Sequence, residues 1–247
     1  MNAALLLLAD SRLPAGGHAH SGGVEEAVRA GAVTGLDDLA RFLRGRLATA
    51  GLVAAALAAA ACELASTAAD AAPAILRWRR LDAEADARTS SPAQREAART
   101  QGRLLVRTAR RIWPSPALSS LARAVPDGAH HPVALGATAA AAGCDPGQAA
   151  LAAAYASVTG PATAAVRLLG LDPVTVHRLL ADLAPSLNET ACAACTAPHP
   201  EHGAVDPDDA WTADPDSPWA ALPATAAPAL DLLAENQLRA ATRLFVS

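Results

Sequence analysis

Hydrophobic residues recur every third or fourth position along most of the chain, the spacing that predicts amphipathic α-helices. The clearest run is Leu36, Leu39, Leu43 and Leu47. We find no sustained alternation of apolar and polar positions, the pattern that would indicate a strand. Alanine, the strongest helix former, supplies much of the 52% hydrophobic content, whereas aromatic residues make up 3%. We therefore expect an all-α fold, a single-domain bundle of roughly nine or ten helices over residues 1–247.

Start and stop signals set the expected helix limits. A Ser-Pro pair at Ser91 and Asp-Pro pairs at Asp145 and Asp172 each predict a helix start, and a capping box at Thr34 opens a long helix. Gly160-Pro161 should break or kink the helix that contains it. The predicted helices are 5–8, 24–30, 34 to about 65, 71–88, 91–113, 133–142, one from 145, one from 172, and 224–240. Between and after them we predict a glycine-rich loop at 11–23, a mobile acidic loop at 196–223 and a C-terminal tail at 241–247.

Residues 47–62 contain no charge but are too few to span a bilayer, and Arg46 and Glu63 flank them. We interpret this segment as a buried core helix. The N-terminus lacks the positively charged start of a signal peptide. The sequence thus predicts a cytoplasmic protein that has no membrane partner.

All 20 basic residues are arginine, and the absence of lysine excludes Schiff-base chemistry and a phosphate-binding loop with its lysine. The net charge of −4 is unevenly distributed. Residues 1–178 hold 18 arginines against 14 acidic residues, a charge of +4, and residues 179–247 hold 2 against 10, a charge of −8. This balance describes a mildly basic body with an acidic end, and it is not basic enough to indicate nucleic-acid binding.

One helix carries an arginine at every fourth position: Arg95, Arg99, Arg103, Arg107 and Arg111. Two interpretations remain open for this series. It could dock carboxylates of a partner protein, because the guanidinium group pairs well with them, or it could be a solvated face. Gly102 within the same helix lowers its stability by about 1 kcal/mol and therefore suggests the close approach of another backbone.

A second candidate is Cys192-x-x-Cys195-x-x-x-His199-x-x-His202. Two thiolates and two imidazoles suffice for a tetrahedral metal site, with zinc or nickel as the ion. A chance cluster in a polar linker is the competing interpretation. The chain has four cysteines, too few for a disulfide-based fold of this length.

The third candidate is the glycine-rich loop, which carries His18, His20 and Ser21 and leads into Glu25. Its chemistry allows a metal site, a Ser–His hydrolase pair, or a packed loop that serves as an interface. The G-x-S-x-G motif of a nucleophile elbow is absent, and neither an orienting carboxylate nor an oxyanion-hole motif accompanies the Ser–His pair.

Four blocks in order resemble the urease accessory protein F family in its actinobacterial form. The first runs Leu8-Ala9-Asp10-Ser11-Arg12-Leu13-Pro14 and continues through Gly16, His18, His20-Ser21-Gly22-Gly23 and Glu25-Glu26-Ala27. The others are Gln101-Gly102-Arg103, the segment Thr159–Leu168, and the ending Arg243-Leu244-Phe245-Val246-Ser247.

The resemblance implies an all-α, non-enzymatic protein without a cofactor that helps to deliver nickel to apo-urease. Its implied partners are urease accessory protein D (also called H) and the GTPase accessory protein G. A tail that orders on partner binding would place Arg243, Leu244 and Phe245 at an interface, and Arg167 falls in the region implied in GTPase recruitment. We therefore expect partner contacts at His18, His20, Glu25, Arg103, Arg167, Arg243, Leu244 and Phe245, and a homodimer as the default assembly. The alternative function is a nickel or zinc carrier that uses Cys192, Cys195, His199 and His202.

Overall fold

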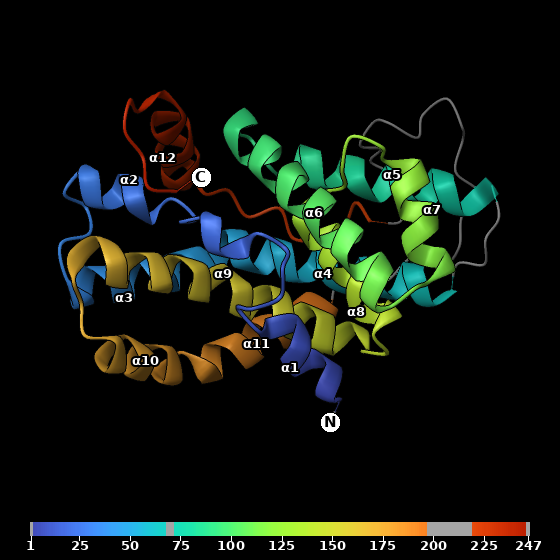
Figure 1. Ribbon diagram of the computed structural model, residues 1–247, viewed down its shortest axis with the longest axis horizontal. Coiled ribbons are helices and arrows are strands. Elements are labelled where there is room, and N and C mark those ends of the chain that lie inside the picture. The colour runs from blue at the N-terminus through green and yellow to red at the C-terminus, as the bar shows by residue number, and fades with distance from the viewer. Residues whose placement is uncertain (1, 68–71, 197–218, 246–247) are drawn as a thin grey trace.

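The centre of the molecule is α4 (Leu52–Thr67), which packs most extensively against α8 (His131–Ala141) and α9 (Pro146–Leu169) (Figure 1). The computed structural model describes residues 2–67, 72–196 and 219–245, and these residues form helices, turns and loops with no strand. Residues 55–62 of α4 are all buried. The predicted all-α class and the predicted core helix are confirmed.

The long helix predicted from residue 34 is present as α3 (Leu36–Arg46), a π-helical segment (Leu47–Gly51) and α4 in direct succession. The N-cap residue is Gly35, and it is Asp38 whose carboxylate accepts hydrogen bonds from the main-chain N–H and the hydroxyl of Thr34. The predicted capping box at Thr34 is therefore wrong, because the helix begins at Leu36 and its N-cap residue has no side chain to cap it.

Small residues allow the central helices to approach closely. A Cβ atom on Gly136 of α8 would lie 2.1 Å from the main-chain oxygen of Ala58 on α4. On α6 (Pro92–Ile112), a Cβ atom on Gly102 would lie 1.9 Å from the main-chain oxygen of Ala129, just before α8. Both contacts are shorter than any side chain permits, which confirms the close backbone approach predicted at Gly102.

A side-chain cap followed by proline opens four helices, because proline lacks only an N–H group that the first turn does not need. Ser91 opens α6, Asp145 opens α9 and Asp172 opens α10 (Pro173–Asp182), as predicted. Ser115 opens α7 (Pro116–Ala124) with the same signal. No helix was predicted over these residues.

The remaining helices surround this core: α1 (Ala3–Ala9), α2 (Val24–Arg29), α5 (Ala72–Ala87), α11 (Ala184–Cys195) and α12 (Pro228–Arg239). In Figure 1, α12 and α2 lie at one end of the molecule, and α5 and α7 lie at the other. The last helix begins at Pro228 rather than at the predicted residue 224.

The predicted acidic loop 196–223 lies largely outside the described residues. Its final part, 219–223, packs against the body, with Trp219 and Leu222 buried. Arg88 donates hydrogen bonds to the main-chain oxygens of Trp219, Leu222 and Pro223. These contacts fix the approach to α12.

Among the described residues, two helices are long and apolar enough to cross a membrane, Leu36–Thr67 and Pro146–Leu169. Their most apolar windows are 67% and 56% buried within the bundle. That burial is typical of the core helices of a soluble domain.

Candidate functional site

The glycine-rich loop joins α1 to α2 and packs on α6. Gly16 has φ of 78°, a conformation that side chains rarely adopt, and a Cβ atom there would lie 3.0 Å from Cδ1 of Leu104. The hydroxyl of Thr108 donates to the main-chain oxygen of Pro14 at 3.0 Å. The loop is therefore held against the helix that carries the arginine series.

Arg46 connects the same loop to α9. Its Nε donates to the main-chain oxygen of Ser157 at 2.9 Å, and its Nη1 donates to that of Gly22 at 2.8 Å. Pro161 lies inside α9 and has no N–H to bond the oxygen four residues earlier, which is that of Ser157. Arg46 replaces this missing donor, so α9 continues through the predicted break point. Burial lowers the pKa of Arg46 to about 10.

The carboxylate of Glu25 in α2 holds the C-terminal tail. It accepts hydrogen bonds from the main-chain N–H groups of Leu244 at 2.6 Å and Phe245 at 3.2 Å. Gln237 of α12 donates to the same carboxylate at 2.9 Å, and the hydroxyl of Ser21 donates to Gln237 at 3.3 Å. We call Ser21, Glu25 and Gln237, all buried, the tail clamp.

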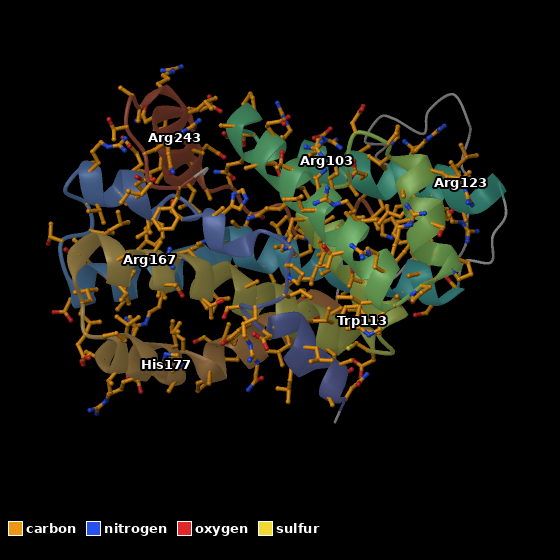
Figure 2. All side chains as sticks on the ribbon, in the orientation of Figure 1. Arg103, Trp113, Arg123, Arg167, His177 and Arg243 are labelled. Atoms are coloured by element: carbon orange, nitrogen blue, oxygen red, sulfur yellow. The ribbon has the colours of Figure 1, made fainter. Side chains whose placement is uncertain are left out.

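The end of the tail has one buried and one exposed side. The ring of Phe245 is buried, whereas the side chain of Leu244 is 75% exposed. Leu232 and Leu238 of α12 are also mostly exposed. Arg243, which precedes Leu244 in the chain, is also exposed and lies at the α12 end of the molecule (Figure 2). The tail and α12, which the tail clamp joins, thus expose large apolar side chains and a cation to solvent.

The Ser–His hydrolase interpretation is wrong. Ser21 is fully buried and its hydroxyl donates to an amide oxygen, so it cannot reach a substrate. His20 is also buried. The side chain of His18 lies outside the described residues.

The predicted partner residues do not form one cluster. Glu25 of the tail clamp bonds Leu244 and Phe245, and Arg243 is adjacent to them in the chain. Arg167 is exposed on α9 and Arg103 is exposed on α6, and Figure 2 shows the two well separated. A partner that contacts all three regions would have to cover much of one side of the molecule.

The arginine series is not a single docking face, because its first half is used within the fold. Arg99 pairs with Asp82 and with Asp86 of α5, each at 2.8 Å. Arg95 donates to the main-chain oxygen of Thr89. Four-residue spacing on a helix does not distinguish an arginine that faces another helix from one that faces solvent.

His130 completes this charged cluster, which we did not predict from the sequence. Its Nδ1 lies 3.1 Å from one oxygen of Asp82, and its Nε2 lies 3.0 Å from Asp86, out of line for a hydrogen bond. Burial alone would lower the pKa of His130, but the two carboxylates outweigh burial and raise it. Contact with His130 in turn lowers the pKa of Asp86 to about 2. The cluster fixes α5 and α6 to the start of α8.

The Cys–His metal site is only partly within the described residues. Cys192 and Cys195 lie on the last turn of α11, and His199 and His202 lie outside the described residues. Within the described part of the chain, no three cysteine, histidine or acidic side chains are placed to hold a metal ion. Burial raises the pKa of Cys195, which disfavours the thiolate that a metal needs. The carrier interpretation stays a prediction.

Comparison with known proteins gives the family of the chain. The UreF family model matches residues 33–184, which include α3 to α10. The chain belongs to the UreF family. The UreF family is one of non-catalytic accessory proteins that act in urease maturation, so the predicted absence of enzymatic activity is confirmed.

Curated relatives support the same assignment. The urease accessory protein UreF of Mycobacterium sp. (strain JLS) is 52% identical over 194 residues, which cover 78% of this chain and 85% of the relative. The UreF of Mycobacterium marinum is 49% identical over 192 residues, covering 78% and 84%. The UreF of Mycobacterium tuberculosis H37Rv is 47% identical over 174 residues, covering 70% and 76%. The predicted family is confirmed.

Proposed function

We propose that this UreF-family chain is a cytoplasmic, non-catalytic scaffold that bridges urease accessory protein D (also called H) and the GTPase accessory protein G. In this role it promotes the insertion of nickel into apo-urease. We further propose that it works as a homodimer. The chain has no lysine for a phosphate-binding loop, so nucleotide hydrolysis would belong to its partner.

The tail clamp is the observation that carries the proposal. A buried carboxylate that bonds two main-chain N–H groups fixes the path of residues 244–245 through the backbone and does not depend on their side chains. The exposed side chains of Leu244, Leu238 and Leu232 are then available to a partner, as is that of Arg243, which precedes Leu244 in the chain. Exposed apolar side chains favour a docking surface, and arginine is enriched at protein interfaces.

We assign this surface to accessory protein D and the exposed Arg167 to contact with accessory protein G. Arg167 lies on α9, which α2 contacts directly, and α2 carries Glu25. The two docking regions are therefore connected through packed helices. A scaffold requires two partner surfaces on one rigid body, and the packing of α2 on α9 supports that proposal.

The test is co-expression of the chain with accessory proteins D and G, followed by size-exclusion chromatography. We expect the wild-type chain to elute with both partners. Glu25→Gln keeps the size of the side chain but turns an acceptor oxygen into an N–H donor that faces donors, so binding of D should weaken by tenfold or more. Glu189→Gln, at an exposed position on α11, is the matched control and should bind as the wild type does.

The outcomes separate the parts of the proposal. If the wild-type chain binds neither partner, the scaffold function is refuted. If the Glu25→Gln variant binds D with wild-type affinity, the tail clamp is not part of that interface. Loss of G with retention of D in Arg167→Glu would support the assignment of the second surface.

A further inference from the structure

A groove between α6 and the α7 region combines an apolar floor with an arginine rim. Its volume is about 440 Å³. The floor includes Val106, Leu121, Val125 and Ala129, all buried. The rim carries four exposed arginines of α6: Arg103, Arg107, Arg110 and Arg111.

The rim arginines form few interactions within the protein. Arg103 donates to the main-chain oxygen of Asp127 at 2.9 Å. Arg107, Arg110 and Arg111 form no ion pair and no hydrogen bond with the residues that the structure describes. Like charges four residues apart destabilise a helix, so this row is unfavourable until carboxylates neutralise it.

We propose that this groove binds an acidic amphipathic segment of a partner protein. Apolar side chains of that segment would lie on Val106, Leu121 and Val125, and its carboxylates would pair with the arginine rim. Arg103, Arg107 and Arg111 succeed one another every four residues, a rise of about 6 Å along a helix. A helix with acidic residues at the same spacing would match them, in the manner of a helix bound in a groove.

The chemistry favours a protein segment over other anions. The apolar floor gives no advantage to an isolated phosphate or to a nucleic-acid backbone. The chain as a whole has a net charge of −4, so it does not attract a long polyanion. The groove lies on α6 and α7, away from α12 and the tail. It is therefore separate from the exposed surface of the tail and α12 that we assign to accessory protein D (Figure 2).

The probe is a fluorescein-labelled amphipathic helical peptide of leucine and glutamate, measured by fluorescence anisotropy with the full chain. We expect the peptide to bind with an affinity that falls as the salt concentration rises. The affinity should be at least tenfold lower in the double variant Arg107→Glu/Arg111→Glu. Arg44→Glu/Arg178→Glu, two exposed arginines outside the groove, changes the net charge equally and should bind as the wild type does. A peptide with glutamine in place of glutamate should not bind.

Three results would overturn the inference. They are equal peptide affinity in the groove and control variants, tighter binding of an oligothymidylate than of the peptide, and a change from dimer to monomer caused only by the groove variant. The last result would show that a second copy of the chain occupies the groove.

The identity of the partner in urease maturation rests on the proposed function, so the same variants are tested with accessory proteins D and G. If the wild-type chain binds them and the groove variant does so equally well, the groove has no role in that complex. If the wild-type chain binds neither but binds the peptide through the groove, the proposed function fails and the groove inference stands.

Discussion

Replacement of Gly102 by alanine should destabilise the protein, although alanine is the better helix former. A Cβ atom at Gly102 would lie 1.9 Å from the main-chain oxygen of Ala129, and such contacts are essentially never shorter than 3.0 Å. The two backbones must therefore separate by about 1.1 Å, the difference between these distances. The obstructing atom belongs to the backbone, so no side-chain rotation can relieve the overlap.

The expected size of the effect follows from three contributions. Overpacking of a rigid contact costs about 3 kcal/mol. Separation also weakens the hydrogen bond from Arg99 to the main-chain oxygen of Gly128, worth about 1 kcal/mol. Alanine recovers about 1 kcal/mol of helix propensity. The net loss is about 3 kcal/mol, which for a chain of this size lowers the melting temperature by about 6–12 °C.

Urea denaturation followed by circular dichroism measures this loss, with Gly45→Ala as the matched control. Gly45 is also helical, but a Cβ atom there meets nothing within 4 Å. Gly45→Ala should therefore gain up to about 1 kcal/mol. If Gly102→Ala unfolds at the same or a higher urea concentration than the wild type, the close approach of α6 to Ala129 is refuted.

Three further predictions concern buried polar groups. Arg46→Leu leaves the main-chain oxygens of Ser157 and Gly22 without donors and should lower the free energy of unfolding, measured by urea denaturation, by about 2–4 kcal/mol. Adding Pro161→Ala to this variant should restore part of the lost stability by returning an N–H group to α9. If the double variant recovers no stability, the role given to Arg46 is refuted. The pKa of His130 is raised above 6.5, so its stabilisation is complete below pH 6.5 and is lost as the pH rises through the folded pKa; the wild type should therefore lose stability as the pH rises above 6.5. His130→Gln should lack this loss, and an unchanged pH profile would contradict the assignment. Arg88→Met breaks a buried pair with Glu84 and should cost about 3–5 kcal/mol. The total tryptophan fluorescence should shift to the red as the contacts of Trp219 loosen. Stability and fluorescence like those of the wild type would count against this prediction.

Local signals predicted most of the helices correctly. The pairs Ser91-Pro92, Asp145-Pro146 and Asp172-Pro173 each open a helix at the expected residue, because capping depends only on residues close in the chain. The same signal at Ser115-Pro116 opens α7, which was not among the predicted helices.

The interactions that position the candidate site could not be predicted in this way, because they join distant parts of the chain. Glu25 and Leu244 are 219 residues apart, and Arg46 and Ser157 are 111 apart. Nothing near Arg99 in the sequence distinguishes it from Arg103, yet one is paired with two carboxylates of α5 and the other is on the surface. The resemblance indicated the family and the tail, whereas the partners of each side chain came only from the fold.

The tail clamp bonds main-chain N–H groups, and these are the same for every residue except proline. Substitution of Leu244 or Arg243 can therefore alter the exposed surface while the path of the tail stays fixed by Glu25 and by the buried ring of Phe245. Related chains could change the partner that they accept through the outward side chains alone. Selection for partner specificity would then act on a few exposed positions without loss of the fold.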